Sequence, residues 1–243
     1  MRVYKNLSEM IEETARELFS RGIRRFDQTR QGKKIDEPTV ELIGYTYTVS
    51  DPSDYDEFFA ISRKICQRDF HRRAIAERWF SEMIGLRGRR CENPQTFWML
   101  HPELRDYFLK YCSEDGRESY TYCSRLKGQI EKVIEKLAEN PERRGAVISV
   151  WRAWDLERVG DRRVPCSMFY QFITRQELDG RRVDVIYVQR SCDFINFFPF
   201  DVYRACRLAE YIAERLGWRQ GRLIHFISSL HAFESEVPDR FKW

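Results

Sequence analysis

The sequence predicts an α+β fold, in which helices pack on one large mixed or antiparallel sheet. Three observations support this fold class. The first half of the chain has helical patterns around a single strand, residues 146–191 have successive strand patterns with no helix between them, and the chain closes with a helix and a strand. No repeat or linker rich in glycine, proline and serine interrupts the 243 residues, so we expect a single domain over residues 1–243.

The first half begins with an amphipathic helix. Apolar residues recur at helical spacing from Leu7 to Phe19, Asn6 can cap the start, and Gly22 can end the helix. The elements predicted after it are a basic loop over residues 24–34, a strand over residues 40–49 and a helix over residues 68–85. Residues 86–122 have no regular pattern.

The second half contains the main block of strands. Its predicted elements are a helix over residues 127–140, strands over residues 146–154, 166–178 and 181–191, a helix over residues 201–217 and a strand over residues 221–233. Pro141 ends the first of these helices, because proline disfavours a helical residue before it. Asp179 and Gly180 predict a hairpin turn between two antiparallel strands. This hairpin would bring residues 189–193 close to Cys166.

Composition and charge argue against several classes of protein. The 42 basic and 38 acidic residues nearly balance, so a nucleic-acid partner is not expected. No apolar run approaches the ~18 residues that span a membrane, and the acidic, amphipathic N-terminus does not have the pattern of a signal peptide. The seven cysteines include no CxxC pair, which argues against a disulfide framework and a zinc site. We therefore expect a cytoplasmic protein without membrane segments or a bound metal.

Cys166 is the first candidate for chemistry, because it follows a proline at the start of a strand and precedes a small polar residue. A nucleophilic cysteine needs partial exposure and a nearby positive charge that favours the thiolate. The hairpin places Arg190 near Cys166, where its guanidinium would supply this charge and bind an anion. The alternatives are that Cys166 is a small core residue and that Arg190 forms a salt bridge at the sheet edge.

Two arginines and a histidine form the other candidate sites. Arg143 and Arg144 lie just after a predicted helix and before a strand. They are either cations that stabilise the negative end of the helix or a two-arginine clamp for a phosphate group. His231, near the end of the last strand, is either a structural histidine or a site residue.

Taken together, these segments resemble the thymidylate synthase superfamily. The motifs that match it, in order and at compatible spacing, are PCSMFYQF, QRSCDFINFFPFD and SLHAF. NPERRG resembles the family's double-arginine loop, and ELIGYTYTVSDP resembles the first strand of the branch that hydroxymethylates nucleotides. The resemblance covers most of the chain and is firmest from about residue 140 to residue 233.

The resemblance implies a thymidylate synthase-like fold and a homodimer that forms through the sheets. It also implies a pyrimidine nucleoside monophosphate as substrate and 5,10-methylenetetrahydrofolate as the one-carbon co-substrate. By position, Cys166 would be the nucleophile that adds to C6 of the pyrimidine. Arg190 and Ser191 would bind the phosphate, and Gln189 would also contact the substrate.

The same resemblance assigns roles around the folate, the sugar and the second subunit. Asp193 would contact the pterin, and Trp98 is a candidate for the tryptophan on the folate side. His231 would contact the sugar 3′-hydroxyl. Arg143 and Arg144 would reach the phosphate in the site of the other subunit, so that the two subunits share arginines.

Two catalytic residues and one more phosphate ligand complete the implied site. Glu77 most resembles the family's catalytic glutamate, in an alignment that can slip by one residue, and Tyr122 resembles the active-site tyrosine. The basic-loop ligand of the phosphate would be one of three arginines, Arg24, Arg25 or Arg30.

Asp201 departs from the family pattern, which has asparagine at this position. An asparagine both accepts and donates, and so matches the N3–H and O4 groups of uracil. A carboxylate accepts from the N4 amino group of cytosine, but faces the lone pairs of uracil O4 at a cost of about 1–3 kcal/mol. The same replacement marks the deoxycytidylate hydroxymethylases of the superfamily, so dCMP is the favoured substrate. The alternative is that Asp201 only caps the helix over residues 201–217, although asparagine would cap equally well.

Three other departures concern the base, the sugar and the folate. Ser167 replaces a histidine, Phe233 replaces a tyrosine near the sugar, and Phe197 replaces a glycine beside the folate. The segment after His231 is also shorter than in thymidylate synthases, which favours attack by water over hydride transfer. We therefore predict conversion of dCMP, 5,10-methylenetetrahydrofolate and water to 5-hydroxymethyl-dCMP and tetrahydrofolate. The alternatives are a CMP 5-hydroxymethylase, a divergent thymidylate synthase that methylates dUMP, and an inactive homologue that binds nucleotides or RNA.

Overall fold

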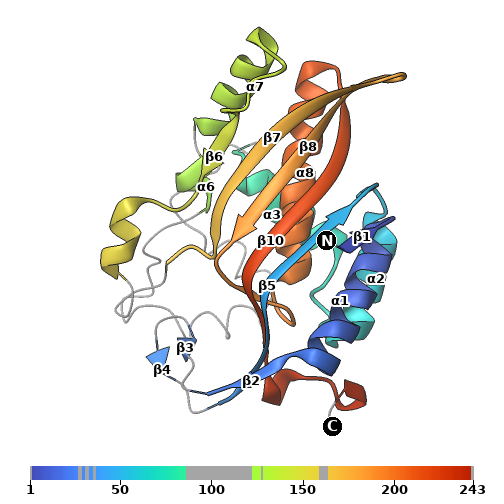
Figure 1. The fold of residues 1–243 in the computed structure, drawn as a ribbon, viewed down its shortest axis with the longest axis vertical. Coiled ribbons are helices and arrows are strands. Elements are labelled where there is room, and N and C mark those ends of the chain that lie inside the picture. The colour runs from blue at the N-terminus through green and yellow to red at the C-terminus, as the bar shows by residue number, and fades with distance from the viewer. Residues whose placement is uncertain are drawn as a thin grey trace.

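A mixed sheet forms the centre of the computed structural model, which describes residues 2–26, 29–30, 33–34, 37–85, 122–126, 128–158 and 164–241. Its strands lie in the order β1-β5-β10-β8-β7-β6 (Figure 1). Their bounds are Arg2–Tyr4 (β1), Thr39–Val49 (β5), Val147–Ser149 (β6), Ser167–Glu177 (β7), Gly180–Gln189 (β8) and Arg219–Phe233 (β10). β2 (Ile23–Arg25) pairs with β5, and β9 (Cys192–Asp193) pairs with β10. β10 runs antiparallel to β5 and parallel to β8, so the sheet is mixed.

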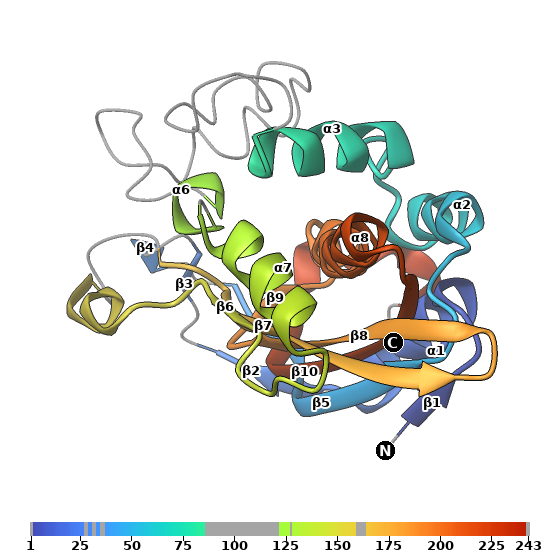
Figure 2. The ribbon, with the colours of Figure 1, turned by 90° about the horizontal axis from the view of Figure 1, so that it is seen from above.

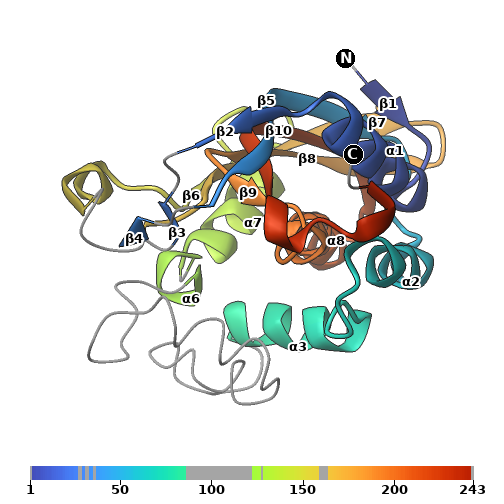
Figure 3. The same ribbon diagram turned by 90° about the horizontal axis from the view of Figure 1, so that it is seen from below.

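The helices of the described residues lie on one face of this sheet (Figures 2 and 3). Their bounds are Leu7–Arg21 (α1), Tyr55–Cys66 (α2), Arg73–Met83 (α3), Tyr122–Leu126 (α6), Gln129–Glu139 (α7) and Phe198–Leu216 (α8). α8 packs directly on β8 and β10, and α3 packs on α8 from outside. The described residues also form the short 3-10 helices Ala153–Arg158 (η1), Glu234–Glu236 (η2) and Asp239–Phe241 (η3). Within the described ranges, no helix combines the length and the apolar character that crossing a membrane requires.

The ends of α1 and the β7–β8 hairpin confirm the local predictions. The Asn6 side chain accepts the backbone N–H of Glu9 at 2.9 Å where α1 begins, and Gly22 donates its backbone N–H to the last turn. β7 and β8 are antiparallel up to Gly180, whose φ of 128° is a conformation that favours glycine.

The structure corrects the predicted elements in three places. The basic loop contains β2 and a separate pair of two-residue strands, Thr29–Arg30 (β3) and Lys33–Lys34 (β4). α2 was not predicted, and the helix predicted over residues 68–85 begins only at Arg73. The strand predicted over residues 146–154 ends at Ser149 and leads into η1.

Asp201 does not cap α8. The helix begins at Phe198, with Phe197 at the N-cap position and proline in the first turn. The backbone N–H of Asp201 donates to the Phe197 carbonyl at 2.9 Å, as in a regular helical turn. The capping alternative is therefore wrong, and the carboxylate of Asp201 is available for other contacts.

The sheet face beneath α8 contains a row of four buried rings. Tyr170, Tyr187, His225 and Tyr47 lie side by side because β7, β8, β10 and β5 pair in this register. The ring centroids of Tyr170 and Tyr187 are 4.5 Å apart, and so are those of Tyr187 and His225. The polar atoms of buried rings need hydrogen-bond partners, so this row forms a polar floor under α8.

The opposite face of the sheet has apolar side chains that are incompletely covered. Phe169, Val188 and Phe226 are neighbours on adjacent strands, and Phe226 is 39% exposed. The helices of the described residues lie on the other side of the sheet (Figure 2). This apolar face is therefore available to a partner.

Gly221 permits a close approach between β10 and β8. A β-carbon at this position would lie 2.0 Å from Oδ1 of Asp184. Asp184 is held in place because it accepts from the Arg222 backbone at 2.7 Å and from Nε of Arg175 at 2.8 Å. We expect Gly221→Ala to lower the free energy of unfolding in urea by about 1–3 kcal/mol. Gly145→Ala, where a β-carbon meets open space, is the control; equal losses in the two variants would contradict this account.

Candidate functional site

The open end of the β7–β8 hairpin joins Cys166 to Arg190 and Ser191. Ser167 lies opposite Gln189, and the backbone N–H of Arg190 donates to the Cys166 carbonyl at 2.9 Å. Oγ of Ser191 lies 3.6 Å from Sγ of Cys166, which is partly exposed. The prediction that this hairpin brings the two segments together is confirmed.

The guanidinium of Arg190 fixes the segment that precedes Cys166. Its Nε donates to the carbonyl of Pro165 at 2.8 Å, and its Nη2 donates to the carbonyl of Val164 at 3.1 Å. Among the described residues, the hydrogen-bond contact of Nη1 is a long one, 3.4 Å from Oγ of Ser191. Since a guanidinium has five N–H donors, this side of Arg190 can still bind an anion beside Cys166.

A buried ion pair joins Asp201 and Arg204 in the first turns of α8. Oδ1 of Asp201 lies 2.6 Å from Nη2 of Arg204, and the two side chains are 7% and 2% exposed. The other carboxylate oxygen accepts from Nε2 of Gln189 at 2.8 Å and lies 3.5 Å from Sγ of Cys192. Both oxygens of the carboxylate are therefore oriented by neighbouring donors.

Arg204 also connects α8 to the polar floor of the sheet. Its Nε donates to the hydroxyl of Tyr170 at 2.8 Å, and its Nη2 donates to the hydroxyls of Ser167 at 3.0 Å and Tyr187 at 2.9 Å. Its Cζ lies 4.0 Å from the ring centroid of Tyr122. Burial opposes the positive charge, but the surrounding tyrosines and the carboxylate raise the pKa of Arg204 well above its ordinary value. Arg204 is therefore cationic although it is buried.

Helix α6 brings Tyr122 to the same cluster. The Tyr122 hydroxyl accepts from Oγ of Ser167 at 3.1 Å, and Trp79 of α3 packs edge-on against the Tyr122 ring at 6.3 Å. Arg125, one turn further along α6, forms a buried two-armed ion pair with Asp155 of η1 at 2.5 and 3.0 Å. This ion pair anchors the short helix and so positions Tyr122.

A chain of hydrogen bonds determines which atoms of Gln189 face Asp201. The hydroxyl of Tyr47 lies 2.8 Å from Nδ1 of His225, and Nε2 of His225 lies 2.9 Å from Oε1 of Gln189. Burial lowers the pKa of His225 to about 3, so its ring is neutral and has one N–H. Because Oε1 of Gln189 can only accept, that proton is on Nε2, and the amide NH₂ of Gln189 is directed at Asp201.

Asp193 and His231 lie together where β9 pairs with β10. The Asp193 carboxylate accepts from the backbone and the side chain of Asn196, at 3.1 and 2.9 Å. Asn196 in turn contacts Arg68 and Glu236, each at 3.0 Å. Asp193 is therefore held in one orientation by contacts that extend to the C-terminal helix η2.

Glu77 lies apart from this cluster. Its carboxylate accepts from the hydroxyl of Tyr203, lies 3.3 Å from Nε of Arg207, and has a side chain that is 40% exposed. The side chain of α3 that lies against Arg204 is Trp79, at 5.1 Å from its ring centroid. The face of α3 that contacts the cluster is therefore the one with Trp79. The position of Glu77 gives no support to its predicted catalytic role, which stays a prediction.

Arg143 and Arg144 also lie away from Cys166 of the same chain. Both are exposed in the turn after α7, and the Arg144 carbonyl accepts from Nε2 of Gln171 at 2.8 Å. Gln171 is five residues along β7 from Cys166, a distance of about 17 Å in a strand. The backbone of Arg144 therefore lies beside the middle of β7 and not at the end that follows Cys166.

The remaining predicted residues are on the basic loop and in the irregular region. Trp98 lies outside the described residues, and so does the side chain of Arg30. Arg24 forms an ion pair with Glu234, and Arg25 lies 3.1 Å from a carboxylate oxygen of β5. Arg24 and Arg25 therefore both have acidic partners in the structure.

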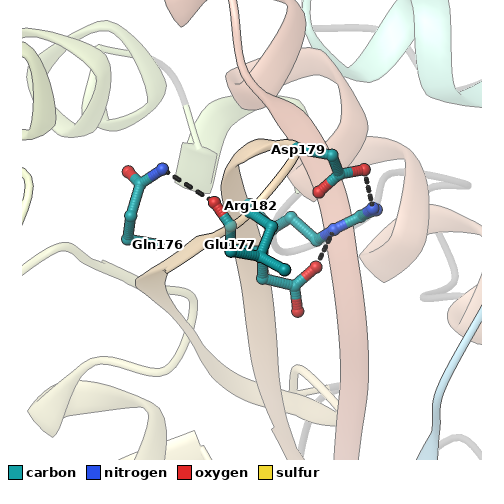
Figure 4. A pocket seen from close by; sticks show the side chains of 5 residues that line it. Gln176, Glu177, Asp179 and Arg182 are labelled. Atoms are coloured by element: carbon teal, nitrogen blue, oxygen red, sulfur yellow. Dashed lines mark hydrogen bonds and ion pairs between the residues drawn. The ribbon is translucent and has the colours of Figure 1, made fainter.

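A hollow at the tip of the β7–β8 hairpin is separate from this site. It is lined by Gln176, Glu177, Leu178, Asp179 and Arg182 (Figure 4). Arg182 forms ion pairs with both Glu177 and Asp179. The hollow lies at the opposite end of β7 and β8 from Cys166, and its arginine is already paired, so we do not include it in the candidate site.

Arg204, His225 and Tyr47 were missed in the sequence. Arg204 follows Asp201 by one helical turn, so both occupy the same face as apolar residues that pack on the sheet. Two opposite charges one helical turn apart on an otherwise apolar face were the pattern in the sequence that could have predicted this ion pair. His225 and Tyr47 alternate with outward residues in their strands, but their partners lie far apart in the sequence.

Comparison with known proteins agrees with this arrangement. The family model described as thymidylate synthase matches residues 107–240, which is more than half of the chain. The chain belongs to the thymidylate synthase family. The thymidylate synthase of Lactococcus lactis subsp. cremoris (strain SK11) is 29% identical in an alignment of 137 residues, and the match covers 54% of this chain and 49% of that enzyme. The chain spans about half the length of the curated relatives it matches.

A solved structure extends the similarity of this thymidylate synthase family member to nearly its whole length. The thermostable thymidylate synthase A from Bacillus subtilis matches 94% of this chain and 80% of its own, with a TM-score of 0.65 and 17% sequence identity. The predicted thymidylate synthase-like fold is thereby confirmed. Among the described residues of the family member, no group of three or more His, Cys, Asp and Glu side chains is placed to hold a metal ion.

Two buried histidines should make this thymidylate synthase family member sensitive to acid. Burial lowers the pKa of both His71 and His225 from 6.5 to about 3. Between pH 6.5 and 3 the unfolded chain binds protons at these sites and the folded chain does not, so stability falls as the pH falls. Each histidine should contribute a loss of up to about 1.4 kcal/mol per pH unit in the free energy of unfolding.

Urea titrations at pH 6.5, 5.5 and 4.5 measure this loss. Compared with the unsubstituted chain, His71→Gln and His225→Gln should each have a smaller change in the free energy of unfolding per pH unit. The reduction should correspond to the uptake of roughly one proton fewer on unfolding. Unchanged slopes in both variants would show that neither histidine is buried and neutral.

Proposed function

We propose that this thymidylate synthase family member hydroxymethylates C5 of the cytosine ring in dCMP. The reaction would consume 5,10-methylenetetrahydrofolate and water and release 5-hydroxymethyl-dCMP and tetrahydrofolate. The observation that carries the proposal is the buried carboxylate of Asp201, beside Gln189 and close to the nucleophile hairpin. Helix capping does not account for this carboxylate, because α8 begins three residues earlier.

Cys166 is the proposed nucleophile. Its sulfur would bond to C6 of the ring, and the electron pair of the C5=C6 bond would move to C5, which then attacks the one-carbon unit. Partial exposure of Cys166 and its contact with Ser191 at 3.6 Å support this role. Arg190 and Ser191 would bind the phosphate beside it, since in the described part of the chain Nη1 of Arg190 makes a long contact with Oγ of Ser191, at 3.4 Å.

Asp201 and Gln189 would bind the base. The carboxylate would accept from the N4 amino group of cytosine, using lone pairs that its protein donors leave unused. Gln189 is oriented so that its amide NH₂ group donates to Asp201. The carboxylate therefore stays an acceptor for the base. Uracil O4 would meet this acceptor without a hydrogen bond, at a cost of about 1–3 kcal/mol.

Asp193 would bind the folate. Hydrogen bonds from the backbone and the side chain of Asn196 hold its carboxylate in one orientation, and carboxylate oxygens are suitable acceptors for the N–H groups of a pterin ring. When bound, the folate would supply the one-carbon unit. The hydroxyls of Ser167, Tyr122 and Tyr187 form a polar wall near Cys166 that could hold the water of a hydroxymethylation.

The first test compares Asp201→Asn with the unsubstituted protein. Tritium released from C5 of dCMP, dUMP and CMP in the presence of the folate reports turnover of each nucleotide. The unsubstituted protein should prefer dCMP, and the variant should shift the ratio of kcat/KM for dCMP over dUMP toward dUMP by about tenfold or more, because the amide matches uracil.

Cys166→Ala is the control for this assay and should release no tritium from any nucleotide. Unchanged selectivity in Asp201→Asn would remove Asp201 from base recognition. Turnover of dUMP alone by the unsubstituted protein would favour a divergent thymidylate synthase, and turnover of CMP alone would favour a ribonucleotide hydroxymethylase.

The exposed sheet face supports a homodimer. Phe169, Val188 and Phe226 form a continuous apolar strip across three strands. Arg143 and Arg144 are exposed in the turn after α7, so their side chains are accessible to a second subunit. We propose that two chains pack these faces together and share these arginines.

Phe226→Lys tests the dimer by placing a charge within the strip. The substitution should convert the dimer to a monomer in sedimentation velocity, because an ammonium group buried between two sheets lacks a partner. Leu178→Lys is the control, since Leu178 is fully exposed at the hairpin tip, away from the strip. A dimer that persists in Phe226→Lys, or a monomeric unsubstituted protein, would contradict the proposed interface.

A further inference from the structure

We infer that Arg204 is a base-binding and catalytic residue, and that its Nη1 group donates a hydrogen bond to N3 of the cytosine ring. This inference rests on the proposed function, because it places the cytosine amino group at Asp201. It adds a second contact to the base, from a residue that the family motifs did not indicate.

The first observation is an unused donor. Nε and Nη2 of Arg204 donate to the hydroxyls of Tyr170, Ser167 and Tyr187 and to the carboxylate of Asp201. Nη1 is buried and has no hydrogen-bond partner among the described residues. Buried polar groups of folded proteins nearly always have partners, so a buried guanidinium nitrogen without one indicates that a ligand or a water molecule supplies the acceptor.

The second observation is the position of this donor. Arg204 contacts Ser167, which directly follows Cys166, and it is paired with Asp201 at 2.6 Å. Its Cζ lies 4.0 Å from the ring centroid of Tyr122, a residue that also contacts Ser167. The unused donor is therefore part of the same cluster as the proposed nucleophile and the proposed base acceptor.

The third observation is the chemistry of the pair. The pair has no net charge, and it combines the unused Nη1 donor of one guanidinium with the acceptor oxygens of the carboxylate that the same guanidinium contacts through Nη2. The Watson–Crick edge of cytosine offers the complementary set, an N4 amino donor beside the N3 acceptor. Asp201 would accept from N4 while Arg204 donates to N3, so that neither the carboxylate nor the base needs to gain a proton.

The same contact would assist the covalent step. When the Cys166 sulfur bonds to C6, the C5=C6 π bond breaks and its electron pair is shared by C5 and N3 through C4. No group leaves in this step, and the negative charge that develops on N3 would be stabilised by the positive Nη1 donor of Arg204. A fixed, buried cation suits this task because it needs no reorganisation when the charge develops.

Two nucleotides and two matched variants test the inference. The probes are dCMP and 3-deaza-dCMP, in which a C–H group replaces N3 and the amino group is retained. Isothermal titration calorimetry should give a Kd for 3-deaza-dCMP that is about 10- to 100-fold weaker than for dCMP in the unsubstituted protein. In Arg204→Met the two nucleotides should bind within about threefold of each other, because the donor to N3 is absent.

Arg207→Met is the matched control. Arg207 lies one turn further along α8, pairs with Glu77 and Glu210, and is not part of the cluster. This variant should discriminate between the two nucleotides as the unsubstituted protein does. A general loss of folding would weaken the binding of both nucleotides alike and would not change the ratio of their Kd values.

A second comparison covers the case in which Arg204→Met leaves Asp201 as an unpaired buried charge and the protein does not fold. Asp201→Asn should still discriminate against 3-deaza-dCMP, and the double variant Asp201→Asn, Arg204→Met should not. Discrimination that persists without Arg204 overturns this inference alone. A protein that binds dUMP and not dCMP overturns both the inference and the proposed function.

Discussion

The site depends on the buried ion pair between Arg204 and Asp201. Removing two charged groups from water costs several kcal/mol for each ion, so such a pair is stable only when its remaining donors and acceptors are matched. Here the hydroxyls of Tyr170, Tyr187 and Ser167 contact the guanidinium, and Gln189 contacts the carboxylate. The pair thus ties α8 to four positions on the β7–β8 hairpin, whose first strand directly follows the proposed nucleophile.

A second constraint is the direction of the hydrogen bonds around that pair. His225 is neutral because it is fully buried, and its single proton is used on Gln189. The amide of Gln189 can therefore present only its NH₂ group to Asp201. In this way the sheet keeps the carboxylate of Asp201 a hydrogen-bond acceptor. An acceptor can bind the amino group of a pyrimidine but not a carbonyl group at the same position.

Much of the fold could be predicted because its signals are local. Asn6 caps α1 and Gly180 closes the hairpin, and both act through contacts within a few residues. α2 was missed because the polar residues before it are typical of a loop. The carboxylate of its N-cap residue, Asp54, accepts from the backbone of α1 and not from α2 itself. The parallel pairing of β10 with β8 joins segments separated by α8, and nothing in either strand alone specifies it.

In the candidate site, too, the residues that could be predicted are those positioned by local contacts. Cys166 and Arg190 could be paired from the sequence because one hairpin connects them. Arg204 could not be placed, because its role depends on which face of α8 meets the sheet and on hydroxyls from two strands. The role of Glu77 stays a prediction: its carboxylate contacts Tyr203 and Arg207 in the structure, and a shift of one residue in the alignment would turn the assigned side chain by about 100° around the helix.

The mass of the product formed from dCMP, 5,10-methylenetetrahydrofolate and the purified protein tests the central claim most directly. The account predicts a nucleotide that has gained the mass of one CH₂O unit, located on C5 of an intact cytosine ring. A product that has gained only a methyl group, or modification of dUMP with dCMP left unchanged, would contradict it.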